Sequence, residues 1–150
     1  MNQLVIASNN SGKLKEIQRV LAPLNWEVLP QSAFNIPEAE EPHHTFIENA
    51  LAKARHASRL SGSPALADDS GICVDALNGA PGVYSAHFAG LPKSDERNNQ
   101  ALLEAMKNIS NRKAYYYCVL VLVRHADDPQ PIIAEGSWHG EIAREPRGEG

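Results

Sequence analysis

The sequence has 150 residues, of which 43% are hydrophobic, as is typical of one globular domain or of two lobes on one core. Its formal net charge of −4 argues against a general nucleic-acid coat protein, because such proteins usually carry an excess of basic residues. We therefore expect no nucleic-acid partner, whereas a few lysines at one site would suffice for a small anionic substrate.

The sequence gives no sign of export or of membrane insertion. Residues 1–8 lack the basic start and the apolar stretch of a signal peptide, and the longest apolar run, 119–123, is far shorter than the roughly 20 residues that cross a bilayer. Cys73 and Cys118 are far apart in strand-like runs, which favours reduced, buried thiols over a disulfide or a metal pair. We expect a cytoplasmic protein with no membrane partner.

The first 30 residues predict a strand, a polar turn, a helix and a second strand. Residues 3–7 are apolar, and residues 8–13 are polar. Leucine and isoleucine then recur at helical spacing over 11–24, and Pro23 favours an end to that helix. With a strand at 26–29, this order predicts a βαβ unit.

A loop at 31–42 carries three carboxylates, and a second helix is expected after it. Thr45 and Glu48 have the spacing of a capping box, one face of the next fifteen residues is apolar, and Gly62 is placed to end the helix. Residues 65–67 predict a short buried strand, and residues 72–74 predict another. The segment Asp68-Asp69-Ser70-Gly71 between them is expected to be a turn.

The last third of the chain predicts one helix and several strands. Ser94 can cap a third helix, and residues 114–124 predict a long strand that is apolar on both faces and therefore central in its sheet. Residues 132–134 and 138–143 predict later strands, which short connections would make antiparallel. The fold class expected is α/β, with a mixed β-sheet and flanking helices.

The polar turn between the first strand and the first helix is a candidate anion site. Backbone N–H groups and the helix dipole favour an anion at a helix N-terminus, and Lys13 adds a positive charge. Ser8, Asn10 and Ser11 add hydrogen-bond donors, although the spacing is not that of a Walker A loop. The alternative is an ordinary capped helix start with an exposed lysine.

The adjacent carboxylates of Asp68 and Asp69 are a candidate metal site. Two neighbouring acids repel each other unless a cation compensates, and Mg²⁺ prefers oxygen ligands. A carboxylate there could also orient or deprotonate a water molecule. The alternative is a solvated turn, and the acidic run 38–41 and the helical face that carries Lys53 likewise have solvated surfaces as their alternatives. The tyrosines at 115–117 could stack on a base or fill the core.

Three of these motifs, in this order and at this spacing, resemble the Ham1-like or inosine-triphosphate pyrophosphatase family over essentially the whole chain. They are the segments 8–16, 45–54 and 67–86. The resemblance implies hydrolysis of dITP, ITP and XTP to the monophosphate and pyrophosphate, with Mg²⁺ as cofactor. It also implies an elongated mixed sheet with two lobes around a central cleft, and a homodimer.

The resemblance also implies a role for each matching residue. Asp69 would be the general base and a Mg²⁺ ligand, with Asp68 in support. A second ligand would come from the acidic loop, most of all Glu40, with Glu38 and Glu41 left open. The residues expected to bind substrate are Ser8, Asn9, Asn10, Ser11, Gly12, Lys13, Lys53 and Ser70.

The resemblance has one large gap, at the end of the sequence. Family members continue into a Gly-Phe-Gly-Tyr-Asp-Pro motif and a Ser-His-Arg motif, and neither occurs here. We therefore expect residues 1–150 to form a single but C-terminally incomplete Ham1-like domain, with the base-recognising half missing. The alternative function is a module that binds nucleotide or metal without turnover. A haloacid-dehalogenase-type phosphatase is disfavoured, because its Asp-x-Asp motif is absent.

Overall fold

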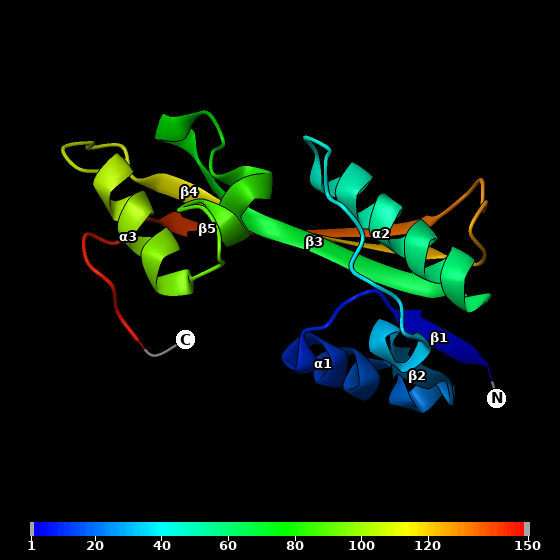
Figure 1. Cartoon of the computed structure of the whole chain (residues 1–150). Coiled ribbons are helices and arrows are strands. Elements are labelled where there is room, and N and C mark those ends of the chain that lie inside the picture. Colours follow the sequence, from blue (N-terminus) through cyan, green and yellow to red (C-terminus); the bar gives the residue numbers. More distant parts are fainter. Residues whose placement is uncertain (1, 149–150) are drawn as a thin grey trace. The chain divides into compact units, whose positions relative to one another are not determined.

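The computed structural model describes residues 2–148 (Figure 1). Within this range the α-helices are α1 (Ser11–Leu21), α2 (Phe46–Ser61) and α3 (Asp95–Ala105), and the strands are β1 (Gln3–Ile6), β2 (Glu27–Pro30), β3 (Ala65–Val74), β4 (Lys113–Val123) and β5 (Ile132–Glu141). None of the helices described between residues 2 and 148 is both long and apolar enough to cross a membrane.

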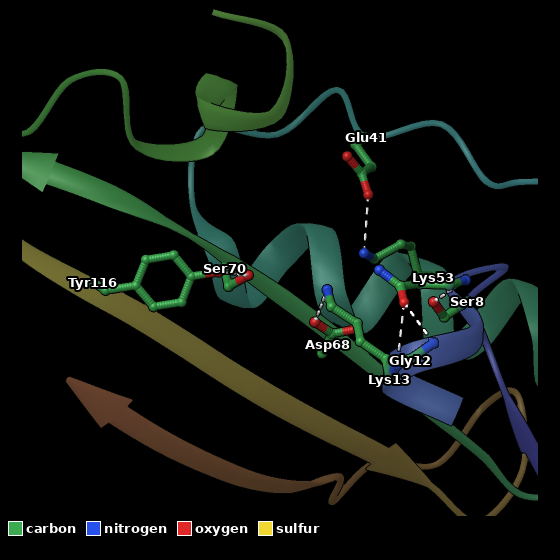
Figure 2. A network of polar contacts seen from close by, with 9 residues as sticks. Ser8, Gly12, Lys13, Glu41, Lys53, Asp68, Ser70 and Tyr116 are labelled. Atoms are coloured by element: carbon green, nitrogen blue, oxygen red, sulfur yellow. Dashed lines mark hydrogen bonds and ion pairs between the residues drawn. The ribbon is translucent and has the colours of Figure 1, made fainter. Parts of the chain in front are cut away.

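The five strands form one sheet with the order β2-β1-β3-β4-β5. Strand β1 pairs in parallel with both β2 and β3, and Val5 lies opposite Leu29 on one side and Ala65 on the other. The arrow of β4 points against those of β3 and β5 (Figure 2), so the sheet is mixed. The predicted α/β class, with a mixed sheet and flanking helices, is confirmed.

The described chain divides into two compact units. The first contains residues 2–69 and 119–135, and the second contains residues 70–118 and 136–148. Strands β3, β4 and β5 each contribute residues to both units. Cys73 of β3 is buried, Cys118 of β4 is half-buried, and neither forms a disulfide, as expected.

The first unit has a core between α1 and the parallel strands. Leu4, Ile6 and Val28 are buried there, and the partly buried side chains of Leu14 and Ile17 pack against them. These two α1 residues belong to the helical repeat seen in the sequence, so the repeat marks the face that covers the sheet. The predicted βαβ unit is confirmed.

The second unit has its own core, and one arginine ties its ends together. Val74, Met106 and Ala114 are buried against the partly buried side chains of α3 and of the segment after β5. The buried Arg112 donates hydrogen bonds to the carbonyl oxygens of Met106 and Ile109 and to those of Ile142 and Ala143. One guanidinium therefore joins the end of α3 to the end of β5.

The helix ends follow the local chemistry of the sequence. Thr45 Oγ1 accepts a hydrogen bond from the N–H of Glu48, and Ser94 Oγ accepts one from the N–H of Arg97. Gly62 ends α2 with a φ of 72°, a left-handed conformation that glycine adopts without steric cost. All three predicted helix boundaries are confirmed.

The strand predictions were wrong at two points. Asp68-Asp69-Ser70-Gly71 is not a turn but the middle of β3, which runs unbroken from Ala65 to Val74. Aspartate is a poor strand former, but here Lys13 neutralises Asp68 and compensates the cost. Likewise β5 is one strand rather than two, and its exposed residues lack the apolar pattern that would have indicated its length.

The turn between β4 and β5 is organised by one buried aspartate in the first unit. The side chain of Asp128 is 1% exposed and accepts hydrogen bonds from the backbone N–H, Nε and Nη2 of Arg124 and from the N–H of Gln130. These bonds, those from Arg124 first, hold the pKa of the Asp128 carboxyl well below its usual range.

We expect Asp128→Asn to lower the unfolding temperature at neutral pH, because the hydrogen bonds of the folded state stabilise the ionised carboxylate. A depressed native pKa stabilises the fold above the usual aspartate range, and this stabilisation is lost as the pH falls. The difference in unfolding temperature from the wild type should therefore shrink below about pH 4. Thermal unfolding at several pH values measures it.

Asp127→Asn is the matched control, because the Asp127 side chain is 87% exposed and contacts Arg59 only at the surface. Equal unfolding temperatures for the two variants at neutral pH would contradict the role given to Asp128, as would a difference that stays constant into acid.

Candidate phosphate and metal site

The turn before α1 is held by its own polar side chains. Asn10 caps the helix, and its Oδ1 accepts hydrogen bonds from the N–H groups of Gly12 at 2.9 Å and of Lys13 at 3.1 Å. Ser8 Oγ accepts a further hydrogen bond, from the N–H of Asn10. An anion would therefore reach the amides of Gly12 and Lys13 by displacing the Asn10 side chain, or would bind the side chains of the turn instead.

Lys13 reaches from α1 to β3. Its Nζ lies 2.6 Å from Oδ2 of Asp68, whose side chain is 9% exposed, whereas that of Lys13 is 41% exposed (Figure 2). The pair thus joins a nearly buried carboxylate to an ammonium group that solvent can still reach. An anion arriving from solvent could contact this ammonium group without any change in the fold of β3.

A second lysine–carboxylate pair lies on α2 of the same unit. Lys53 Nζ is 3.0 Å from Oε1 of Glu41, and Glu38 Oε1 accepts a hydrogen bond from Asn9 Nδ2 at 3.1 Å. The acidic loop is therefore tied both to α2 and to the turn before α1. Local sequence patterns gave no signal for either contact, since the partners are 12 and 29 residues apart. Glu40, the preferred metal ligand, is exposed, and its role stays a prediction.

The acidic loop, residues 38–41, is also flanked on both sides by residues that bind α2. The buried Asn49 side chain accepts from the N–H of His43 and donates to the His43 carbonyl oxygen. His56 Nε2 lies 2.9 Å from the carbonyl oxygen of Pro37. Asn49 is buried, so this part of α2 is not a solvated face but anchors the loop.

Asp69 and Ser70 follow Asp68 in β3. Asp69 is a half-buried residue of the first unit, whereas Ser70 is the first residue of the second unit. Within the second unit, Ser70 Oγ lies 2.9 Å from Oη of Tyr116, which is on β4 (Figure 2). No local sequence pattern links Tyr116 to Ser70, because the pairing of β3 with β4 is needed to bring them together.

The predicted site residues are thus distributed unequally over the two units. The first unit contains the residues of the anion turn, the two lysines and the predicted metal ligands: Ser8, Asn9, Asn10, Ser11, Gly12, Lys13, Glu40, Lys53 and Asp69. The second contains Ser70. Within the first unit, hydrogen bonds and ion pairs connect the anion turn to β3 and to the acidic loop.

The donor chemistry of the first unit suits a hard divalent cation. Carboxylate oxygens are what Mg²⁺ binds, often through only one or two protein ligands, with water and substrate phosphates completing the shell. Asp69 and the acidic loop supply such oxygens. Among the described residues, no three histidine, cysteine or acidic side chains gather closely enough to form a complete metal cage. A cation here would therefore depend on substrate and water for its remaining ligands.

Substitution of Lys13 should reveal how much the fold depends on its pairing with Asp68. We expect Lys13→Met to lower the free energy of unfolding by about 1–3 kcal/mol, because it leaves a nearly buried carboxylate without its cation. Urea denaturation measures the change. Lys15→Met, an exposed position on the same helix, is the control and should change the stability by less than about 0.5 kcal/mol. Equal stabilities of the two variants would show that the pair does not support the fold.

The Ham1 family profile matches residues 4–150. A dITP/XTP pyrophosphatase of Chromobacterium violaceum is 66% identical over 149 residues, which are 99% of this chain and 76% of that protein. A dITP/XTP pyrophosphatase of Nitrosomonas europaea is 65% identical over 150 residues, all of this chain and 74% of that protein. A solved HAM1 protein from Coxiella burnetii is 48% identical with a TM-score of 0.96, covering 100% of this chain and 77% of that one. Since profile, sequences and structure agree over nearly the whole length, the chain belongs to the Ham1 family.

Proposed function

We propose that this protein hydrolyses non-canonical purine nucleoside triphosphates, namely dITP, ITP and XTP, to the monophosphate and pyrophosphate. The observation that carries the proposal is the pair of lysine–carboxylate contacts, Lys13 with Asp68 and Lys53 with Glu41, beside the capped start of α1. Relatives that are 65% and 66% identical bear the name dITP/XTP pyrophosphatase, which supports this substrate class.

The two lysines are suited to bind the triphosphate. A triphosphate carries several negative charges, and an ammonium group gains most from an anion when it is held in place beforehand. Asp68 and Glu41 hold Lys13 and Lys53 by ion pairs, and the turn from Ser8 to Lys13 adds hydroxyl and amide donors. Substrate phosphate would compete with these carboxylates for the lysines.

The carboxylates of the first unit would serve the metal and the attacking water. Asp69 is assigned as general base and as a ligand of Mg²⁺, with Glu40 as the second ligand. Bound Mg²⁺ would neutralise phosphate charge and orient water. The family resemblance implies Asp69 for proton transfer, and Asp68, which is paired with Lys13, would support it. Ser70 is assigned to substrate contact.

The alternative of a binding module without turnover receives less support. The relatives named above carry the name of an enzyme. The lysines and carboxylates that we assign to phosphate and metal are also present in the described part of this chain. We further propose that the chain acts as a homodimer in the cytoplasm. The homodimer follows the family resemblance, and the cytoplasmic location is the expectation already stated from the sequence.

Product analysis tests the reaction type. With Mg²⁺ and ITP, dITP or XTP, we expect pyrophosphate and the nucleoside monophosphate in equal amounts, and no reaction once EDTA removes the metal. Anion-exchange chromatography separates pyrophosphate from orthophosphate. Orthophosphate as the first product would point to a different phosphatase chemistry, and binding of ITP without any product would favour the binding module.

Replacement of Asp69 tests the assigned base. We expect Asp69→Asn to reduce kcat by at least about 100-fold, because loss of a general base typically costs that much, with little change in the unfolding temperature. Asp75→Asn is the matched control, since Asp75 is an exposed aspartate just beyond the end of the same strand. If the Asp69 variant turned over as fast as this control, another group would have to be the base.

A further inference from the structure

A tyrosine hydroxyl on β4 lies against the serine that we assign to substrate contact. Tyr116 Oη and Ser70 Oγ are 2.9 Å apart, and both residues belong to the second unit (Figure 2). The Tyr116 side chain does not fill the core, because the residue is 48% exposed. Of the two alternatives expected for the tyrosines at 115–117, stacking on a base or filling the core, Tyr116 therefore does not follow the second.

Burial does not require the hydrogen bond between Tyr116 and Ser70. A half-exposed hydroxyl can satisfy its hydrogen-bonding capacity with water, so a bond to one serine is not needed to avoid a desolvation penalty. The hydrogen bond instead affects the orientation of the Ser70 hydroxyl. A serine hydroxyl turns among three rotamers about χ1, and a fixed partner at hydrogen-bond distance favours one of them.

The chemistry of the two hydroxyl groups suggests the direction of the bond. A phenol is the better donor and an aliphatic alcohol the better acceptor, so Tyr116 donating to Ser70 is the favoured arrangement. An oxygen that accepts a hydrogen bond also becomes a stronger donor through its own hydrogen, by mutual polarisation. A serine in this state is suited to donate to a phosphate or sugar oxygen of a nucleotide.

We propose that Tyr116 is a positioning residue, which orients the Ser70 hydroxyl for the bound nucleoside triphosphate without touching that substrate itself. This inference rests on the proposed function, since it takes Ser70 as a substrate contact. The hydroxyl of Tyr116 adds to substrate affinity only through Ser70. The two hydroxyl groups therefore act together, and removal of either one removes the contribution of their hydrogen bond to substrate affinity.

A double-mutant cycle tests this dependence. The four proteins are the wild type, Tyr116→Phe, Ser70→Ala and the double variant, and the readout is the dissociation constant of ITP by calorimetry in EDTA, where metal-dependent turnover is suppressed. We expect Tyr116→Phe to weaken ITP binding about three- to tenfold, the value of one hydrogen bond, and to have no effect once Ser70 is alanine. With Mg²⁺ present, KM should rise while kcat stays the same.

Tyr115→Phe is the matched control. It removes the neighbouring hydroxyl of the same strand, whose pKa is raised chiefly by the Cys73 side chain, and it should leave ITP affinity unchanged. Unfolding temperatures of all variants separate a loss of affinity from a loss of fold.

Three results would overturn the inference. They are unchanged ITP affinity in Tyr116→Phe, an equal loss in the presence and absence of the Ser70 hydroxyl, which would mean a direct contact with substrate, and an equal loss in Tyr115→Phe. A wild type that binds ITP but releases no pyrophosphate would contradict the proposed function alone, because the binding cycle needs no turnover.

Discussion

The ion pair between Lys13 and Asp68 is the interaction on which the first unit depends most. It places a positive charge from the start of α1 on the middle of β3, and so allows two adjacent aspartates to lie within a strand. Without a cation, the nearly buried Asp68 carboxylate would be costly. The same lysine is the one that we assign to the substrate phosphates, so one side chain would serve both the fold and the site.

This double role makes charge balance the organising feature of the site. Lys53 is paired with Glu41 as Lys13 is with Asp68, and Glu38 is tied to Asn9. A triphosphate brings negative charge and Mg²⁺ brings positive charge. If phosphate replaces the carboxylates as the partner of the lysines, the negative charge of those carboxylates is no longer balanced and favours a cation. We therefore expect phosphate and metal to favour each other's binding. The anchored acidic loop keeps Glu41 beside Lys53.

Local patterns in the sequence predicted the features that depend on neighbouring residues, such as helix caps and helix ends. The capping side chains of Thr45 and Ser94, the end of α2 at Gly62 and the helical repeat of α1 all depend on residues within one or two turns. The motif positions were assigned through the family resemblance.

The continuity of β3 could not be predicted locally, because it rests on Lys13, which is 55 residues from its partner. Tyr116 and Ser70, 46 residues apart, were likewise brought together only by strand pairing. The partners of Glu38 and Glu41 were also beyond local reasoning, because an acidic run has the same sequence pattern whether it faces water or a lysine.

The central claim is that lysines held by carboxylates in the unbound chain receive the phosphate chain of a nucleotide. Calorimetric titration of the wild type and of Lys53→Gln with ITP and with IMP tests it most directly, with Lys15→Gln as control. We expect Lys53→Gln to reduce the preference for ITP over IMP by about tenfold or more, because a charge-assisted contact to the additional phosphates is lost. An unchanged ratio of the two affinities would contradict the claim.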